Sequence, residues 1–318
     1  MKILFITSTR IGDAVLSSGL LNYLAGVYPQ ARFTIACGPA AAPLFATFPA
    51  LERLIAMPKE KRSGHWLKLW LACFGTIWDM VVDLRRSAIS WLLLTKERRV
   101  LKLSKAKIHR LRLLADLFAL PDPPAPRLWT SPEAEATAER LLPADGQPIL
   151  ALGPTANWTA KTWRGENFVE LAKRLTAPGG LLAEARIVLF GAPSEREAAR
   201  PVIEGLAGPR LVDLIGNIDL VTVYACLKRV DLYVGNDSGL MHMAAAADIP
   251  TIGLFGPSPE VHYAPWGKKS VVVRTAIAYE DIFGENFNPI GAPSLMDSLS
   301  IESVEQAAAR LLDKRRAA

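Results

Sequence analysis

The chain has 318 residues, 50% of them hydrophobic and 21% charged, which is typical of a globular protein and excludes intrinsic disorder. This length is sufficient for two domains of ordinary size. The formal net charge of +6 suits an anionic ligand, a phospholipid surface or nucleic acid, and charge alone does not separate these from a merely soluble basic surface.

Three cysteines lie far apart, without a paired spacing or a cysteine/histidine cluster: Cys37, Cys73 and Cys226. We therefore expect neither a disulfide framework nor a zinc site, and a reducing compartment fits this usage. The N-terminal residues do not resemble a signal peptide, because the apolar run is short and soon meets polar residues.

Strand-like runs alternate with helical patterns in the first part of the chain, which is typical of a parallel sheet covered on both faces. Strands are predicted at 2–7, 31–37, 51–57, 79–84 and 98–103, and helices at 14–27, 41–48 and 108–120.

Residues 66–82, WLKLWLACFGTIWDMVV, are the most membrane-like segment. The segment contains Lys68 and Asp79 and is short for a bilayer span, so we reject a transmembrane helix. The tryptophans at 66, 70 and 78 could lie at a lipid interface. We favour the alternative, a buried helix that runs into a strand.

A composition change follows at 121–132, where five prolines in twelve residues exclude a helix or a central strand. A second α/β series begins at PILALG, after a short helix at 133–142. Strands are predicted at 148–153, 185–191, 211–215, 231–236 and 251–256, and helices at 166–175, 194–206, 220–228 and 239–247. We predict two doubly wound domains, 1–145 and 146–300, with a hinge near 121–146 and a closing helix at 301–315 that could pack back on the first domain.

The connection after the first strand, TSTRIGD, lies at the carboxyl edge of the predicted sheet, where open α/β sheets bind ligands. Asp13 is a credible N-cap for the following helix. A helix N-terminus would also keep its carboxylate ionised, as a general base requires. From these residues alone, the capping role is favoured.

Three loops at predicted strand ends of the second domain have unusual compositions. The loop 153–163 brings hydroxyls and Lys161 to the sheet edge, and the turn 191–197 contains Glu195, which could bind a ribose or begin a helix. The strongest is GNDSGLMHMAAAADIPTIGLFGPS, in which Ser238 and Gly239 would present backbone N–H groups to an anion. His242 lies one turn further on the same helix face.

These loops, in this order, resemble glycosyltransferase family 9, the ADP-heptose:lipopolysaccharide heptosyltransferases. The segments on which this resemblance rests are STRIGDAVLSSG, KTW with ENFVELAKRL, GAPSERE and VGNDSGLMHMAAAADIPTIGLFGPS, and they are distributed over nearly the whole chain. The resemblance implies an α/β GT-B fold with two Rossmann-like doubly wound domains that face a central cleft. The first domain would bind the acceptor and the second the nucleotide sugar.

The resemblance also implies roles for individual residues. Asp13 matches the general base of an inverting transfer, and Lys161 matches a lysine that contacts the donor phosphates. The other residues that match donor contacts are Thr155, Glu195, Ile218, Asp237, Ser238, Gly239 and His242. No metal and no cofactor are implied, since the nucleotide sugar, expected to be ADP-heptose, is a substrate. Two departures are a loop before Lys161 that is about two residues longer than usual and Arg164 in place of a proline.

The expected acceptor is an anionic lipopolysaccharide core. Candidate contacts, each also explicable as a solvated residue, are Arg10, Gly12, Arg85, Arg86, Lys105, Lys107 and Arg110. The implied location is cytoplasmic, with peripheral association at the inner membrane left open. A different nucleotide sugar or envelope glycan is the main alternative. The chain lacks a dinucleotide glycine fingerprint, a Walker sequence and a recognisable nucleic-acid motif, so a nicotinamide oxidoreductase or a nucleic-acid-binding module is less favoured.

Overall fold

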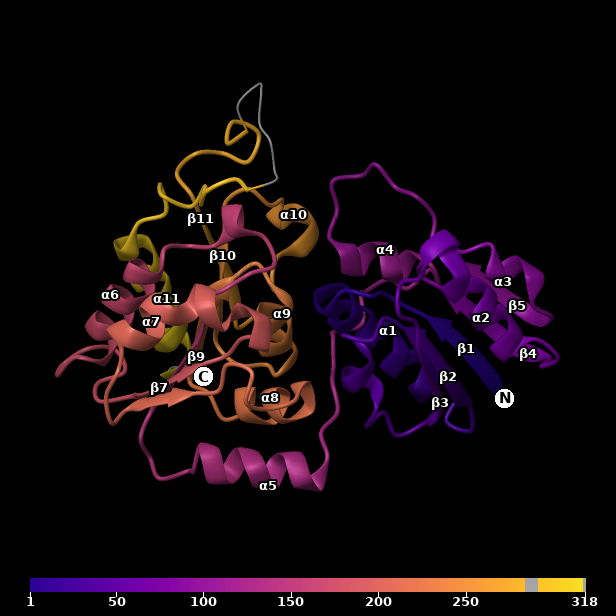
Figure 1. The fold of residues 1–318 in the computed structure, drawn as a ribbon, viewed down its shortest axis with the longest axis horizontal. Helices are drawn as coiled ribbons and strands as arrows, with labels where there is room; N and C mark the ends of the chain where they lie inside the picture. Colours follow the sequence, from indigo (N-terminus) through magenta and orange to yellow (C-terminus); the bar gives the residue numbers. More distant parts are fainter. Residues whose placement is uncertain (284–290, 317–318) are drawn as a thin grey trace. The chain divides into compact units, whose positions relative to one another are not determined.

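The computed structural model describes residues 1–283 and 291–316, which form two compact units that divide between Ser131 and Pro132 (Figure 1). The sequence places the boundary at 145/146 instead. The difference is the helix α5 (Pro132–Leu141), which packs against α8 (Leu220–Leu227) and buries Ala134 and Ala138. An amphipathic helix joins the unit that covers its apolar face, and the proline-rich stretch before it is therefore the true connection.

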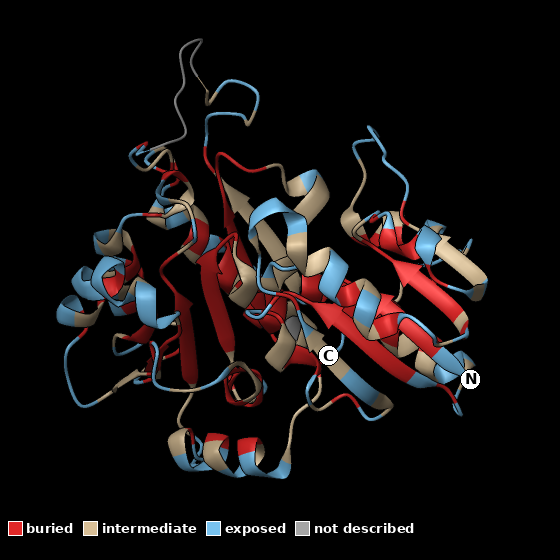
Figure 2. Ribbon diagram, turned by 45° about the vertical axis from the view of Figure 1, so that its right-hand side comes forward, coloured by how far each residue is buried: buried red, intermediate tan, exposed pale blue. Residues whose placement is uncertain are grey.

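The first unit is a five-stranded parallel sheet with the order β3-β2-β1-β4-β5. Its central strands are buried on both faces, as their apolar sequences require (Figure 2). The strands are β1 (Lys2–Ile6), β2 (Arg32–Cys37), β3 (Leu51–Ala56), β4 (Trp78–Asp83) and β5 (Thr95–Val100). The helices are α1 (Ile11–Val27), α2 (Gly64–Cys73), α3 (Ile89–Leu92) and α4 (Arg110–Asp116), with 3₁₀ turns η1 (Ala42–Phe45) and η2 (Lys61–Ser63).

Helices α1 and α2 cover opposite faces of this sheet. The chain moves one way across the sheet from β1 to β2 and the other way from β3 to β4, so right-handed crossovers place their helices on opposite sides. Leu69 and Cys73 of α2 share a core cluster with Leu4 and Ile6 of β1. The favoured prediction at 66–82 is a buried helix that runs into a strand. The order is confirmed, since α2 leads to β4, but the expected burial is wrong: α2 buries Leu69 and Cys73 and exposes Leu67 and Leu71.

The second unit is a six-stranded parallel sheet with the order β11-β10-β9-β6-β7-β8. The strands are β6 (Ile149–Gly153), β7 (Arg186–Leu189), β8 (Leu211–Asp213), β9 (Leu232–Asn236), β10 (Thr251–Phe255) and β11 (Ser270–Arg274). The further helices are α6 (Gly165–Thr176), α7 (Arg196–Gly205), α9 (Gly239–Ala246), α10 (Glu260–Tyr263) and α11 (Ile301–Arg316), with 3₁₀ turns η3 (Thr159–Lys161) and η4 (Pro193–Glu195). The sequence reading missed β11, although SVVVR has the β-branched composition of a strand.

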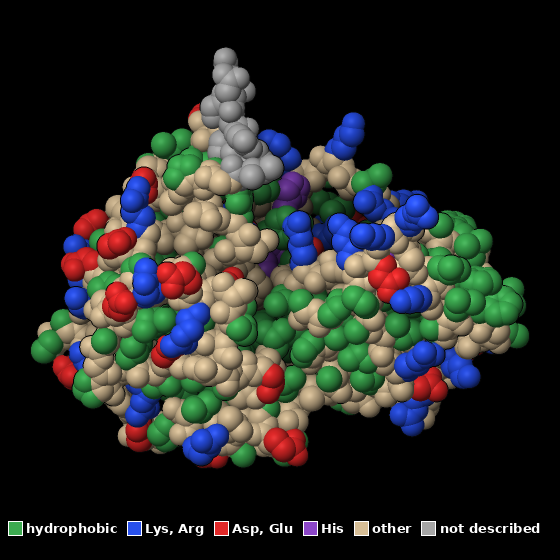
Figure 3. Space-filling model, viewed as in Figure 1, with side chains coloured by type: hydrophobic (Ala, Val, Ile, Leu, Met, Phe, Trp, Pro, Cys, Tyr) green, Lys and Arg blue, Asp and Glu red, His purple; other side chains and the backbone are tan. Residues whose placement is uncertain are grey.

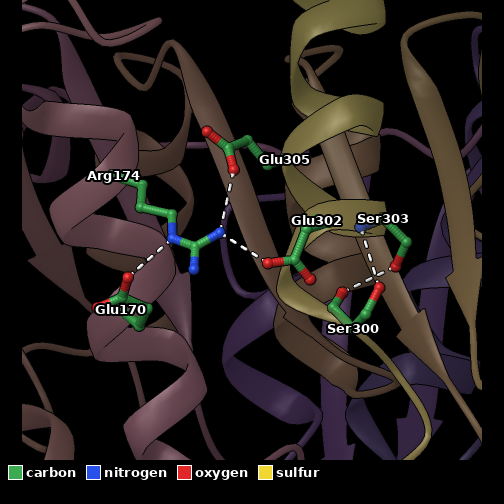
Figure 4. Close-up of polar contacts among 6 residues, drawn as sticks. All are labelled: Glu170, Arg174, Ser300, Glu302, Ser303 and Glu305. Carbon is green, nitrogen blue, oxygen red and sulfur yellow. Dashed lines mark hydrogen bonds and ion pairs between the residues drawn. The ribbon is translucent and has the colours of Figure 1, made fainter.

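The closing helix α11 belongs to the second unit, so the packing on the first unit that the sequence left open does not occur. Val304 and Ala308 are buried in the core cluster that includes Leu171 of α6, and α11 also contacts β10 and β11. On the surface, the Arg174 guanidinium of α6 bonds to Glu170 and reaches across to Glu302 of α11, both at 2.8 Å (Figure 4). The helix therefore packs on the sheet of its own unit and covers part of one face.

Each sheet has a topological switch point, where successive connections leave in opposite directions. In the first unit this point lies between β1 and β4, and in the second it lies between β6 and β9. The loops after these strands meet at the carboxyl edges of their sheets. They include the predicted Asp13 turn, the Arg85 and Arg86 turn, the Lys161 loop and the Asp237 loop. No helix within the described residues is long and apolar enough to cross a membrane.

All three cysteines are free and buried, and burial raises the pKa of Cys37 to about 12 and that of Cys73 to about 11. Because the thiolate is the reactive form, we expect no reaction with Ellman's reagent at pH 8 in the native protein. Unfolding in guanidinium should release all three thiols at once. Rapid native-state labelling of any one of them would contradict this packing.

Candidate functional site

A cavity of about 260 Å³ opens at the switch point of the first unit. It is bounded by the ends of β1 and β4, the start of α1, the loop after β5 and helix α4. Its charged lining consists of one carboxylate and four cations, namely Asp13, Arg85, Arg86, Lys102 and Arg110. The cavity is therefore suited to an anionic molecule with a group that can lose a proton.

Asp13 is the third residue of α1, whose N-cap position is Arg10, so the predicted N-cap role is wrong. The helix begins at Ile11, three residues before the predicted start. The partly buried Asp13 carboxylate lies in the first turn, where the helix dipole favours an anion. Its Oδ2 accepts a long hydrogen bond of 3.4 Å from the Ser8 hydroxyl. The carboxylate is thus left to face the cavity instead of closing the helix end.

The four cations of the cavity take part in no ion pair within the described residues. Arg86 is exposed and holds a left-handed backbone with a φ of 55°, which directs the turn after β4. Of the other predicted acceptor contacts, Arg10, Gly12, Lys105 and Lys107 do not line the cavity. Lys102 does, and the sequence reading did not select it.

Asp83, at the end of β4, shapes the turn that holds Arg85 and Arg86. It was not selected from the sequence either. Its fully buried carboxylate accepts hydrogen bonds from the backbone N–H of Arg85 at 2.8 Å and from the N–H and hydroxyl of Ser87, both at 2.7 Å. A buried carboxylate needs such partners to offset its desolvation. The only sequence signal was an aspartate that ends an apolar strand, DMVVD.

We expect Asp83→Ala to lower the free energy of unfolding by about 1–3 kcal/mol, because it leaves buried N–H donors without acceptors. It should also weaken the binding of an anion in the cavity, since Arg85 would lose its fixed turn. Urea denaturation measures the first effect. The matched control is Asp116→Ala, which removes an exposed carboxylate paired with Arg112 and should change stability by less than about 0.5 kcal/mol. Equal effects of the two substitutions would contradict the role of Asp83.

In the second unit, the loops after β6 and β9 meet through an ion pair. Lys161 Nζ lies 3.2 Å from Asp237 Oδ2, and the two side chains are 16% and 11% exposed. The predicted loop after β6 is therefore confirmed as a neighbour of the predicted loop after β9. The pair places a cation and a carboxylate side by side at the switch point.

Asn236 and Trp163 hold these two loops together, and neither was selected from the sequence. The Asn236 amide oxygen accepts a 2.9 Å hydrogen bond from the Trp163 N–H. The buried Trp163 indole donates to the carbonyl of Leu299 at 3.0 Å and packs edge-to-face on Phe168. This explains why the tryptophan follows Lys161 so closely, since it anchors the segment that carries the lysine.

Helix α9 begins immediately after this ion pair. Ser238 is its N-cap residue but makes no capping bond through its side chain, and Gly239 is the first helical residue. The N–H groups of the first turn are thus available to an anion. Nearby along the chain, His242 is 4% exposed in the second turn of α9.

Buried hydroxyls also lie at the ends of β6 and β9. Thr155 is 2% exposed, and its Oγ1 has no hydrogen-bond partner among the residues that the structure describes. Burial raises the pKa of Tyr233, an effect that Ser238 opposes, so the phenol stays a donor at neutral pH. A Cβ at Gly153 or Gly235 would lie 2.1 or 2.3 Å from the Tyr233 hydroxyl, which explains both glycines.

Glu195 and Ile218 lie in the loops after β7 and β8, further along the same sheet edge. Glu195 Oε2 accepts a 2.7 Å hydrogen bond from the N–H of Ala192 and so caps its own turn. Ile218 is half-buried before α8, whose N-cap is Asp219. The structure thus gives Glu195 a local structural role, and a ligand contact would use its other oxygen.

The described residues contain no group of three or more His, Cys, Asp or Glu arranged to hold a metal ion. Lys161, Asp237, Ser238 and Gly239 are brought together in the second unit, while Asp13, Arg85, Arg86 and Arg110 line one cavity in the first.

Comparisons with known proteins identify the family of this chain. The model of glycosyltransferase family 9 (heptosyltransferase) matches residues 75–285, more than half of the chain. A lipopolysaccharide heptosyltransferase 2 from Salmonella typhimurium is 26% identical over 321 residues, covering 89% of this chain and 90% of its own. A lipopolysaccharide heptosyltransferase 1 from Pseudomonas aeruginosa is 24% identical and covers 85% and 83%.

Solved structures show the same fold. The ADP-heptose heptosyltransferase II of E. coli superposes with a TM-score of 0.77 at 25% identity, covering 99% of this chain and all of that one. A family 9 glycosyltransferase of Veillonella parvula gives a TM-score of 0.79 at 20% identity, with coverage of 98% and 97%. The two doubly wound α/β units are those of a GT-B fold, as the sequence predicts.

Proposed function

Because this chain belongs to glycosyltransferase family 9, we propose that it transfers heptose from ADP-heptose to the core of a lipopolysaccharide acceptor. The proposal is carried by two clusters of residues, one in each unit. A carboxylate lies in a basic cavity of the first unit. A lysine, an aspartate and an uncapped helix N-terminus share one sheet edge in the second.

Asp13 is the proposed general base. Its carboxylate takes the proton of an acceptor hydroxyl while that oxygen attacks the anomeric carbon of the donor. The bond to the phosphate oxygen breaks as the new glycosidic bond forms, and its electron pair leaves with ADP. Attack opposite the leaving group inverts the anomeric configuration.

Lys161 and the N-terminus of α9 are the proposed donor-phosphate site. Both offset the charge that develops on departing ADP, Lys161 through its ammonium and Gly239 through its backbone N–H. In this proposal Asp237 orients Lys161 before the donor arrives, and the 3.2 Å contact between them supports this role. Thr155, Glu195, Ile218, Ser238 and His242 complete the donor site in this proposal, which uses no metal or cofactor.

The acceptor would bind through the cations of the first unit, chiefly Arg85, Arg86 and Arg110, with Arg10 and Gly12 in the adjoining turn. These cations have no ion-pair partner in the described part of the chain, which supports an anionic acceptor. The resulting location is the cytoplasmic face of the inner membrane, where the protein would associate peripherally. Another nucleotide sugar or envelope glycan is the second candidate for the same site.

A thermal-shift screen with ADP-, GDP-, UDP- and CDP-sugars tests the donor. A donor at one hundred times its Kd stabilises the native state by about 2.7 kcal/mol, which corresponds to a rise of a few degrees in Tm. We expect this shift with ADP-heptose and not with the other sugars. Stabilisation by a different nucleotide sugar alone would replace ADP-heptose with that donor.

A further inference from the structure

Helix α2, GHWLKLWLAC, has two apolar faces. Leu69 and Cys73 are buried in the core, and Trp66 and Trp70 pack beside them. The opposite face would normally be polar in a helix that meets water. Here it carries Leu67 and Leu71, and Phe74 follows at the next turn. The alternative that the sequence left open had the tryptophans at a lipid interface, whereas the structure exposes the leucines and buries Trp78.

Helix α3 and its flanks extend this apolar face. The Trp70 indole of α2 donates a hydrogen bond to the Leu92 carbonyl at 3.3 Å, which joins the two helices. Seven side chains, each between 59% and 67% exposed, form what we name the α2–α3 surface: Leu67, Leu71, Phe74, Ile77, Trp91, Leu92 and Leu94. Figure 3 shows hydrophobic side chains gathered over this part of the first unit. Exposed apolar side chains that gather on one surface indicate an interaction site.

Basic residues border the α2–α3 surface. The segment 59–68, which leads into α2, holds four basic residues against one acidic residue. The Lys68 and Lys96 side chains are more than 70% exposed although each has a carboxylate partner. Arg98 lies over the ring of Trp91 at 4.8 Å. An apolar patch with a cationic border matches the interface of an anionic bilayer.

Helix α2 also contacts a residue that lines the acceptor cavity. Arg85 lines that cavity, and its guanidinium also lies over the ring of Trp66 in α2, 5.6 Å from the centroid. Leu103, another lining residue, is 82% exposed. A lipid-linked sugar could therefore enter the cavity while its acyl chains stay in a membrane under the α2–α3 surface.

We propose that the α2–α3 surface docks this protein on an anionic phospholipid bilayer, with its apolar side chains in the interface and its basic border on the headgroups. The inference rests on the proposed function only for the lipid-linked acceptor. A second copy of the chain fits less well, because a symmetric contact through this surface would bring like-charged borders together.

Flotation of the full-length protein with vesicles tests the proposal. We expect binding to vesicles of phosphatidylglycerol and phosphatidylethanolamine, weaker binding to pure phosphatidylcholine, and a decrease at high salt. The triple variant Leu67→Gln, Leu71→Gln, Phe74→Gln should bind at least about tenfold less. The matched control, Val27→Gln, Val261→Gln, Ile277→Gln, replaces three exposed apolar residues on other elements and should bind like the wild type.

A second variant distinguishes a loss of membrane binding from a loss of folding. Lys61→Glu, Arg62→Glu, Lys68→Glu leaves the apolar residues intact and should also lose binding to anionic vesicles. Both variants should keep the Tm of the wild type and its turnover of a delipidated, water-soluble acceptor. Their turnover of the same acceptor embedded in vesicles should fall about tenfold or more. Lack of turnover with every acceptor, together with intact vesicle binding, would overturn the proposed function and leave the docking surface.

Two results would overturn the docking proposal. One is equal flotation of the wild type and both variants. The other is sedimentation of the wild type as a dimer that the glutamine variant dissociates, without flotation of either protein, which would identify the α2–α3 surface as a contact between copies.

Discussion

Asp13→Asn is expected to lower turnover by about two to four orders of magnitude, because it removes the proposed base from the cavity. The substitution preserves the size of the side chain and the hydrogen-bond acceptor for Ser8, so the first turn of α1 should keep its structure. Donor affinity should be unchanged, since the donor-phosphate residues belong to the second unit. Steady-state kinetics and a donor titration on the same preparation measure the two quantities.

The control for this prediction is Asp79→Asn. Asp79 lies in the same unit but outside the cavity, where its carboxylate bonds to Lys96 at 2.6 Å and to the N–H of Lys2 at 2.7 Å. It should keep turnover within about twofold of the wild type, as a surface substitution does. Should Asp13→Asn behave like Asp79→Asn, the base would have to be sought elsewhere and Asp13 would be a residue of the helix start alone.

Lys161→Ala is expected to weaken donor binding and to lower turnover by about 10²- to 10³-fold, the usual effect of removing one charge-stabilising group. The substitution also leaves the mostly buried Asp237 carboxylate without its 3.2 Å partner. Part of the effect could therefore arise from instability, and the Tm must be measured with the kinetics.

A double-mutant cycle separates these contributions. Asp237→Asn removes the unpaired charge, so the double variant should regain stability relative to Lys161→Ala and stay defective in donor binding. Lys228→Ala is the control, because Lys228 pairs with Glu135 on the surface of the same unit. A double variant with normal donor affinity would refute the phosphate role of Lys161.

Local patterns predicted most of the fold. The strands and the helices that cover them follow from apolar runs, and a parallel sheet brings strand ends to one edge. For that reason the sequence could place the Lys161 and Asp237 loops together. The Asp13 carboxylate and the Arg85 turn met at one cavity for the same reason, since β1 and β4 are neighbours.

Long-range packing and hydrogen bonding could not be predicted in this way. Helix α5 joins the second unit because α8 covers its alanines, and α11 does so because α6 covers Val304. An apolar strand pattern does not reveal that the Asp83 carboxylate accepts a hydrogen bond from the backbone N–H of Arg85. Nor does it reveal that Glu195 accepts one from the N–H of Ala192 in its own turn. These depend on which atoms meet after folding.

The unselected Asn236 illustrates the same limit at the site. Its amide joins the loops after β6 and β9 over a separation of 73 residues. Its neighbour Asp237 was selected because it matches the motif of the family. A buried amide acts only through the partners it receives, here the N–H of Trp163.

Incubation of the protein with ADP-heptose and a lipopolysaccharide core acceptor is the most direct measurement, with mass spectrometry for the product and NMR for its new anomeric centre. The account predicts the addition of one heptose, with an anomeric configuration opposite to that of the donor, and loss of this product with Asp13→Asn. Transfer with retained configuration, or transfer only from a different nucleotide sugar, would contradict it.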